Sequence, residues 1–347
     1  MKTRPANIED LEKILNFNKE VFPNRPNSDE FLDYRLLKNP YSNRTLDSLY
    51  ITENDEGEII AQSITLPEKI AFKNQIYPAY WGQDYIVKEE YRKYGIGIGL
   101  SKLFLKKDFY FGVHASPKAL QLQLKLGCKV IGRLDYLYKP TSYFHLLKFL
   151  FRRLLKLKNP SLKKYVFPSS INNFNLIERI EDFNAPYVQW NQDIIETLRD
   201  SDFIQWRFLF KKNRYFIYQM KNSETGNPAY FVVRPVQWKA VNSLMLVDYR
   251  YNIQKASDFV SILKTVHFLA KKLNLYAVFT SSSLTLTHEI LLSNHYKKLK
   301  GSSIFCTFPF QHKAESETTN NYFQASLADS DSEFYFGKGK FIYGEDY

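Results

Sequence analysis

One stretch decides how the first half of this chain is interpreted: Trp81-Gly82-Gln83-Asp84-Tyr85-Ile86-Val87-Lys88-Glu89-Glu90-Tyr91-Arg92-Lys93-Tyr94-Gly95-Ile96-Gly97-Ile98-Gly99. A strand in its first part runs into a tight loop and then into the start of a helix. At such a turn, unpaired backbone N–H groups and the positive end of the helix dipole face the same point. The stretch therefore predicts a binding site for a phosphate group.

The residues of the loop favour a diphosphate. Gly95 and Gly97 remove the side chains that would hold a pyrophosphate away from the backbone amides, and Arg92 adds a charge-assisted donor. A glycine-rich turn used only for close packing is the alternative interpretation. The loop follows an antiparallel meander and lacks a Gly-Lys-Ser or Gly-Lys-Thr ending, which argues against a dinucleotide fingerprint and against a P-loop.

The elements around the loop follow a simple order. We expect a first strand, a helix capped by Asn7, a three-stranded meander ending at Val87, the glycine-initiated helix and a strand over 109–113. A helix then begins after Ser116 and ends at Gly127, and a strand over 129–137 closes the unit.

The second half repeats this order of elements. Ser116 precedes Gly127 by eleven residues, and Ser283 precedes Asn294 by the same spacing, with Asn as the other residue that tolerates a left-handed helix end. Two copies of one fold are therefore expected.

The predicted fold class is α/β of the α+β type, with two domains that each contain a mixed, mostly antiparallel sheet flanked by helices. The expected boundaries are 1–140 for the first domain, 141–165 for a basic amphipathic connecting helix, 166–312 for the second domain and 313–347 for a C-terminal tail.

These motifs resemble those of the GNAT superfamily of acyl-CoA-dependent N-acyltransferases. The family's Arg/Gln-x-x-Gly-x-Gly/Ala loop matches Arg92, Gly95 and Gly97. The family's second block is a helix of the form Asn-x-x-Ala-x-x-Leu-Tyr-x-Lys-Leu-Gly-Phe. This chain is similar to it at Ser116, Ala119, Leu122, Lys125, Leu126 and Gly127. The resemblance covers about residues 1–140, and the second half resembles the family only in element order, as in tandem-GNAT proteins with a degenerate second domain.

The resemblance implies acetyl-CoA as co-substrate and an N-acetyltransferase activity in which a primary amine attacks the thioester directly. Backbone groups near Tyr85 and Val87 would pair with the pantetheine arm at a splay in the sheet. The implied coenzyme-binding residues are Tyr85, Ile86, Val87, Arg92, Lys93, Tyr94, Gly95, Ile96, Gly97, Ile98 and Ser116.

Asp84 is the candidate base or amine anchor, with a strand-end aspartate bonded to a loop as the alternative. The family's tyrosine acid falls at Gln123, a poor acid, so Tyr136 or Tyr138 on the last strand is the candidate replacement, with Tyr136 selected as the catalytic candidate. A thiol with a pKa of about 8.5 also leaves without a strong acid.

Composition and charge limit the other functions. The formal net charge of +12 is compatible with nucleic acid, acidic lipid or phosphorylated ligands. The six histidines show no metal-ligand spacing, so we expect no metal. A non-catalytic acyl-CoA-binding or scaffolding protein is the alternative to an enzyme. A nucleic-acid-binding module is a third reading, and no nucleic acid is expected as a partner.

The expected partner is a small-molecule amine, and a cytoplasmic setting fits a chain with two cysteines in different halves and no apolar signal segment. The helix over 143–158 is both basic and strongly apolar, so peripheral contact with an anionic membrane is an open alternative. Packing of this helix against the two domains is the favoured interpretation.

Overall fold

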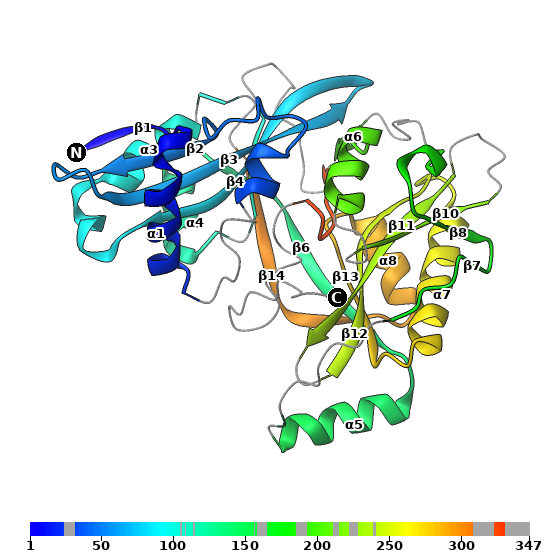
Figure 1. Cartoon of the computed structure of the whole chain (residues 1–347). Helices are drawn as coiled ribbons and strands as arrows, with labels where there is room; N and C mark the ends of the chain where they lie inside the picture. The colour runs from blue at the N-terminus through cyan, green and yellow to red at the C-terminus, as the bar shows by residue number, and fades with distance from the viewer. Residues whose placement is uncertain are drawn as a thin grey trace. The chain divides into compact units, whose positions relative to one another are not determined.

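A computed structural model describes residues 1–23, 32–104, 106–107, 109–113, 115–155, 157, 165–184, 193–210, 215–221, 228–238, 241–307 and 323–329 (Figure 1). These residues form two compact units. Unit 1 takes residues 1–132 and 303–307, and unit 2 takes 133–302 and 323–329. The chain changes unit within strands β6 (Lys129–Pro140) and β14 (Lys297–Thr307), so the division differs from the boundaries expected at residues 140 and 312.

Unit 1 is built on one mostly antiparallel sheet, in the order β1-β2-β3-β4-β5-β14. Its other strands are β1 (Lys2–Pro5), β2 (Leu49–Glu53), β3 (Ile59–Phe72), β4 (Gln75–Val87) and β5 (Tyr110–Val113). Its helical segments are η1 (Ile8–Asp10), α1 (Leu11–Val21), η2 (Asp33–Leu37), η3 (Glu89–Tyr94), α3 (Ile96–Phe104) and α4 (Pro117–Lys125). Among the described strands of unit 1, only β4 and β5 run parallel, and α3 lies between them in the chain.

Local chemistry explains the start and the longest hairpin of unit 1. Asn7 caps η1 in a capping box with Asp10, whose carboxylate also accepts two hydrogen bonds from Arg4 at 2.6 and 2.7 Å. That hydrogen-bonded guanidinium holds the pKa of Asp10 below its ordinary value. Lys73 and Asn74 both adopt positive φ in the two-residue turn that joins β3 to β4.

Unit 2 contains a second mostly antiparallel sheet, in the order β14-β6-β13-β12-β11-β10-β8-β7. Its strands beyond β6 and β14 are β7 (Ser170–Ile171), β8 (Phe174–Ile177), β10 (Phe216–Met220), β11 (Tyr230–Trp238), β12 (Val241–Arg250) and β13 (Ala277–Ser282), with β9 (Ile195–Thr197) paired to β15 (Phe323–Gln324). The helical segments are α5 (Tyr143–Leu154), η4 (Ile180–Asp182), α6 (Ser201–Ile204), η5 (Gln205–Leu209), α7 (Ala256–Lys272) and α8 (Thr285–Ser293). The predicted fold class is confirmed in both units.

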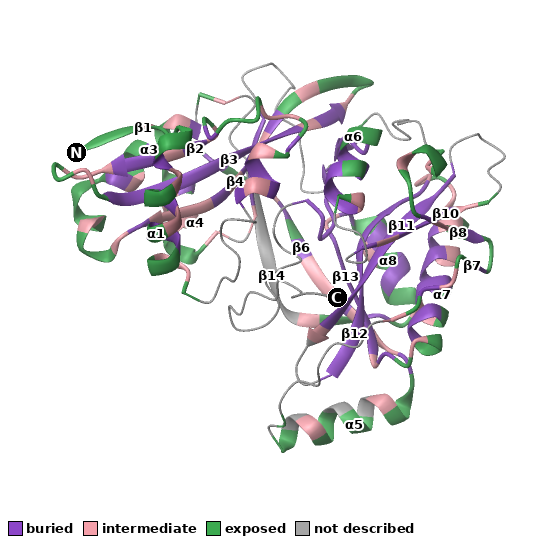
Figure 2. Ribbon diagram, in the orientation of Figure 1, coloured by how far each residue is buried: buried purple, intermediate pink, exposed green. Residues whose placement is uncertain are grey.

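The core of unit 2 lies where α7 packs on its sheet. Phe259, Ile262 and Val266 of α7 are completely buried and belong to one apolar cluster with Phe231 and Leu246 of the sheet. Figure 2 shows β11 and β12 buried along most of their length. These three residues of α7 are spaced by three and four, which is the period of one face of a helix.

The sequence predicts a left-handed residue at the end of two equivalent helices, and the structure has it at one of the two predicted positions. Gly127 ends α4 in the left-handed region with φ +97°, as predicted. The equivalent assignment to Asn294 is wrong, because Asn294 has φ −92° and His295 carries the positive φ of +65°. The N-cap of α8 is likewise Leu284 and not Ser283, so the spacing of eleven is retained one residue later.

Helix α5 does not bury its apolar face. Tyr143, Phe144, Leu147, Phe151 and Leu154 are 60–90% exposed, so the expectation that this helix packs them against the domains is wrong. Figure 2 shows the exposure along the helix. No helix in the described part of the chain combines the length and the apolar character needed to cross a bilayer.

Candidate functional site

Strand β4 carries a β-bulge at the residues singled out by the sequence. Gln83 pairs with Ile64 and Ile86 pairs with Gln62, so Asp84 and Tyr85 stand opposite the single residue Ser63. Asp84 has φ +47°, a conformation that few residues other than glycine adopt. A bulge of this kind bends the strand and changes the direction of its side chains.

The bulge coincides with the end of pairing between β4 and β5. The two parallel strands are in register at Tyr80 with Tyr110, Trp81 with Phe111 and Gly82 with Gly112. Beyond Gly82, β4 continues through Val87 with no further partner in β5 among the described residues. The side of β4 that faced β5 is therefore without a strand partner beyond Gly82, and such a splay is the geometry that an added pseudo-strand requires.

Gly82 lets an aromatic ring lie at the mouth of this splay. A Cβ atom at Gly82 would lie 1.8 Å from the hydroxyl of Tyr110, whose ring stacks on Phe104 with centroids 4.8 Å apart. Tyr110 and Phe104 are both completely buried, so the ring has no room to move away. Sequence reasoning missed this pair, although a glycine inside a strand is a signal for such a close approach.

Tyr85 joins the bulge to the start of α3. Its hydroxyl donates to the carbonyl oxygen of Gly97 at 2.6 Å and accepts from Ser101 Oγ at 3.1 Å. Burial raises the pKa of Tyr85, so the phenol stays protonated and remains a donor at neutral pH. A Cβ atom at Gly97 would approach the same hydroxyl to 2.7 Å, which gives Gly97 a structural reason to be glycine.

The loop before α3 is tied back to the end of β4. Arg92 donates from Nε to the carbonyl oxygen of Val87 at 3.1 Å, and its guanidinium lies 3.8 Å from Glu89 while half of the side chain stays exposed. Gly95 follows η3 with φ +73°, and its carbonyl accepts the first bonds of the helix, from the amides of Ile98 and Gly99. The amides just before them lie at positions that have no acceptor within a helix.

The remaining predicted coenzyme residues lie in β4, in the turn itself and at the start of α4. Ile86 is half-buried at the bulge, Ile96 is buried, and Lys93, Tyr94 and Ile98 are exposed. Ser116 caps α4 by accepting from the amide of Ala119 at 3.3 Å. Helix α4 also reaches the turn, because a Cβ atom at Gly97 would lie 3.5 Å from Leu122.

The two predicted catalytic residues belong to different units. Asp84 is half-buried in the β4 bulge of unit 1, whereas Tyr136 lies in β6 opposite Ser281 of β13 in unit 2. Gln123, at the position of the family tyrosine, is buried in α4. No cluster of metal-ligating side chains occurs in the described ranges.

Gln83 is a residue of this region that sequence reasoning did not select. It is 5% exposed, and within the described structure neither its amide oxygen nor its amide nitrogen has a hydrogen-bond partner. Its cross-strand partner Ile64 lies two residues from Gln62, which donates to Asn18 of α1 at 2.8 Å on the same face. A buried amide with both groups unsatisfied is rare and needs an explanation, such as a ligand.

Unit 2 repeats both the bulge and the splay. In β11 and β12, Val232 pairs with Asp248 and Val233 pairs with Leu246, which leaves Val247 as the extra residue. The parallel strands β12 and β13 are in register only at Leu244 with Val278 and at Met245 with Phe279. The end of β12 is therefore free of β13, as the end of β4 is free of β5.

The chain itself fills the splay of unit 2. The amide of Ala328 donates to the carbonyl of the bulged residue Val247 at 3.2 Å. Ser283 Oγ donates to the carbonyl of Phe323 at 2.5 Å and accepts from the amide of Ala325 at 2.7 Å. The segment 323–329 thus occupies the carbonyl of Val247 at the bulge of β12, which would otherwise be open to a ligand.

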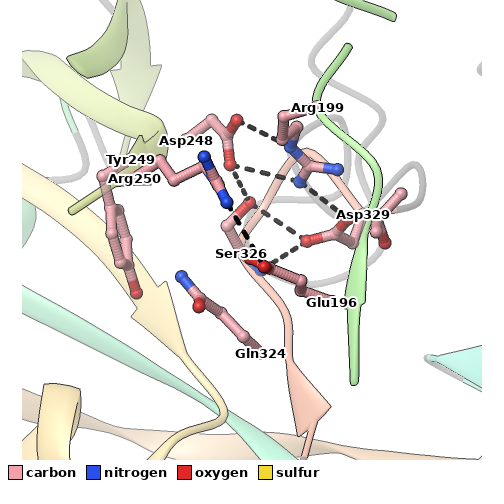
Figure 3. A pocket seen from close by; sticks show the side chains of 9 residues that line it. Glu196, Arg199, Asp248, Tyr249, Arg250, Gln324, Ser326 and Asp329 are labelled. Atoms are coloured by element: carbon pink, nitrogen blue, oxygen red, sulfur yellow. Dashed lines mark hydrogen bonds and ion pairs between the residues drawn. The ribbon is translucent and has the colours of Figure 1, made fainter. Parts of the chain in front are cut away.

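Buried charges hold that segment in place (Figure 3). Arg199 donates to Asp248 at 2.9 Å and to Asp329 at 2.7 Å, and all three side chains are at most 7% exposed. Ser326 Oγ also donates to Asp248 at 2.7 Å, and Arg250 pairs with Glu196 at 3.3 Å. Sequence analysis missed this network, because its members lie far apart in the chain.

The small pocket at these residues has little to offer a ligand. It is lined by Glu196, Thr197, Arg199, Asp248, Tyr249, Arg250, Gln324, Ser326 and Asp329. Most of its charged groups already bind one another (Figure 3). No glycine-rich turn follows β12, since Tyr251-Asn252-Ile253-Gln254-Lys255 leads into α7.

Comparisons with solved structures place this fold. Saccharomyces cerevisiae N-myristoyltransferase with bound myristoyl-CoA superposes with a TM-score of 0.57 and 12% identity, over 90% of this chain and 79% of that one. A GCN5-related N-acetyltransferase from Anabaena variabilis gives a TM-score of 0.56 at 13% identity, over 88% of this chain and 71% of that one.

A probable N-acyltransferase from Enterococcus faecalis gives a TM-score of 0.54 at 12% identity, over 88% of this chain and 71% of that one. No protein-family model and no curated protein sequence matches the chain. At these identities the likeness concerns the fold. The chain therefore has the fold of the GCN5-related N-acetyltransferases, in a two-domain arrangement.

Proposed function

We propose that the chain is an acyl-CoA-dependent N-acyltransferase whose coenzyme binds in unit 1, with acetyl-CoA as the donor and a primary amine as the acceptor. The observation that carries the proposal is the splay beside the β4 bulge, which leads directly into the Arg92 to Gly97 turn. The splay would pair with the pantetheine arm and the turn would hold the pyrophosphate.

Each part of the turn has a role in the proposal. Gly95 and Gly97 keep side chains away from the amides at the start of α3, and Arg92 supplies a cation that is already positioned by Val87. Tyr85 fixes the distance between the strand and the helix through Gly97. The coenzyme would therefore meet donors that need little rearrangement.

The proposed reaction depends on positioning more than on covalent catalysis. The nitrogen lone pair of a neutral amine attacks the thioester carbon, and the C–S bond breaks as the coenzyme thiolate leaves. We propose that Asp84, directly or through water, takes the proton that the amine loses. Because a free thiol has a pKa of about 8.5, the thiolate leaves without a strong acid, so the step needs no dedicated proton donor.

Gln83 supports a polar acceptor. Its amide carries one acceptor and two donor hydrogens, and all of them lack a partner in the described part of unit 1. An amine, hydroxyl or amide of the acceptor would satisfy this group next to Asp84. We therefore propose that the acceptor contains a hydrogen-bonding group beside the reacting nitrogen.

The test combines binding and turnover. Isothermal titration with acetyl-CoA, and with myristoyl-CoA as the long-chain comparison, measures affinity, while thiol release with a panel of amines measures transfer. In Asp84→Asn, which keeps a side chain tolerant of positive φ, we expect thiol release to fall by about 10²–10⁴ with unchanged acetyl-CoA affinity.

Two results would overturn the proposal. If the wild-type protein binds neither acetyl-CoA nor myristoyl-CoA, the proposed coenzyme site is wrong. Tight binding with no thiol release across the amine panel indicates a non-catalytic acyl-CoA-binding protein instead. A preference for myristoyl-CoA would correct the donor and leave the acyltransferase in place.

A further inference from the structure

Helix α5 presents an apolar face away from unit 2. Tyr143, Phe144, Leu147, Leu150, Phe151 and Leu154 are spaced by one, three and four residues, which places them on one side of a helix. Their exposures range from 50 to 90%. Scattered exposed apolar residues need no explanation, but a continuous helical stripe of this size does.

The opposite side of α5 is fixed to the body of unit 2. Thr141 lies two residues before the helix. Its Oγ1 donates to the carbonyl of Leu275 at 2.6 Å and lies 2.7 Å from His145 Nδ1. The His145 ring lies 4.7 Å from the ring of Tyr276, and Lys148 Nζ lies 5.6 Å from the same ring. The helix therefore turns its polar side toward the protein and its apolar side toward solvent.

The charge of this region has one sign. The sequence from Tyr136 to Ile177 contains no Asp or Glu and eight Lys or Arg residues, namely Lys139, Lys148, Arg152, Arg153, Lys156, Lys158, Lys163 and Lys164. A cationic segment attached to an exposed apolar stripe supplies the two attractions that bind a protein to an anionic lipid surface.

We propose that α5 is a membrane-docking helix that lies in the interface of a bilayer containing anionic lipids. Tyr143, Phe144 and Phe151 would enter the boundary between headgroups and acyl chains, together with the leucines of the stripe. A second copy of this chain is a poorer occupant, because it would bring two cationic segments together. An acidic protein surface would pair with the cations but would not bury the apolar stripe of aromatic and leucine side chains.

The experiment uses the full chain and vesicles of phosphatidylcholine mixed with phosphatidylglycerol. Flotation measures the bound fraction, and vesicles of phosphatidylcholine alone are the reference. We expect binding to the mixed vesicles that weakens as salt is added. The double variant Leu147→Glu with Phe151→Glu should weaken this binding by about 100-fold or more, because two apolar anchors are lost and two negative charges gained.

Phe268→Glu is the matched control. Phe268 lies on α7 of the same unit and is 51% exposed, so this variant adds an acidic group at an exposed phenylalanine outside the stripe. Its binding to vesicles should stay within about twofold of wild type. Circular dichroism melting should show that both variants remain folded.

Several outcomes would overturn the inference. They are no flotation of the wild type, equal flotation with both vesicle types, or equal loss in the α5 variant and the Phe268→Glu control. If the wild type is a dimer in gel filtration and the α5 variant loses both the dimer and its flotation, the stripe binds a second copy of the chain instead. Because the coenzyme is absent from the assay, failure here leaves the proposed acyltransferase untouched.

Discussion

In the described part of the chain, β4 and β12 each part from a parallel neighbour just before a bulge, and the two strand ends differ in what lies against them. In unit 1 the freed strand leads into the Gly95 and Gly97 turn. In unit 2 the freed strand is bonded to Ala328 and enclosed by the Arg199 network.

The difference shows how one backbone geometry serves two purposes. A bulge and a splay alone leave unsatisfied peptide groups, which must find some partner. Unit 2 supplies that partner from its own chain and stabilises it with buried charges. In unit 1 we propose that the partner is a coenzyme, so the two splays respond differently to pH and to substitution.

The largest difference is expected at alkaline pH. Burial is the first cause that raises the pKa of Tyr218, Tyr230, Tyr249, Tyr251 and Tyr296 in unit 2, with Tyr251 raised to about 12. These phenols stay protonated in the folded unit and ionise near pH 10 once unfolded. Stability is therefore intact below pH 10 and falls as pH rises toward and beyond 12, by up to about 1.4 kcal/mol per pH unit for each group.

In unit 1, burial raises the pKa of the half-buried Tyr50 and Tyr85. Limited proteolysis with an alkaline-active protease, with cleavage sites mapped by mass spectrometry, should show unit 2 opening at lower pH than unit 1. Tyr251→Phe should make that dependence shallower. Simultaneous opening of both units at one pH would contradict the comparison.

Substitution of Arg199 should cost unit 2 about 3–5 kcal/mol of unfolding free energy, because Arg199→Met leaves Asp248 and Asp329 buried without their cation. Urea unfolding measures the loss. The affinity of unit 1 for acetyl-CoA, measured by titration at a temperature where the variant is folded, should not change.

Arg179→Met provides the matched control in the same unit. Arg179 pairs with Asp182 at 3.2 Å, but its side chain is 73% exposed, so no measurable loss is expected. If both arginine variants unfold like wild type, the buried network does not hold segment 323–329 in place. If Arg199→Met weakens acetyl-CoA binding tenfold, the two splays are coupled.

A smaller effect should separate two glycines of α3. A Cβ atom at Gly97 would lie 2.7 Å from the Tyr85 hydroxyl, whereas one at Gly99 would meet nothing within 4 Å. Gly97→Val should therefore weaken acetyl-CoA binding by at least about tenfold, or about 1.4 kcal/mol, and Gly99→Val by less than about twofold. Both variants place a β-branched residue in the same helix.

Tyr85→Phe tests the cause of the Gly97→Val effect, because it removes the hydroxyl that the valine side chain would meet. Gly97→Val should be less harmful in that background, which titration of the double variant measures. Equal losses for the two glycine variants would mean that the loop tolerates side chains and that the proposed pyrophosphate contact is wrong.

The sequence predicted the parts of the fold that depend on local signals. The end of α4 follows from Gly127, a residue that adopts positive φ without strain. The prediction that Asn294 ends α8 in the left-handed region was wrong, because His295 adopts the positive φ instead. Tertiary contacts decide between two neighbouring residues, and no local pattern reports them.

The sequence predicted the glycine-rich turn of the candidate site, but it did not predict the side-chain contacts around the two splays. The Arg92 to Gly97 stretch is contiguous, so its pattern is visible in the sequence. The Gly82 and Tyr110 contact and the Arg199, Asp248 and Asp329 network join residues distant in the chain. Such groups become neighbours only through the strand order, which single-sequence patterns do not specify.

The passage of β14 from one unit to the other has a consequence for biosynthesis. Phe305 to Thr307 form the strand beside β5 of unit 1, although the rest of that unit is translated before residue 133. The apolar edge of β5 therefore stays without this partner strand until residues 305–307 have been synthesised. A cut between residues 140 and 297 would leave the N-terminal fragment without that strand, so coexpressed halves should be recovered together or not at all.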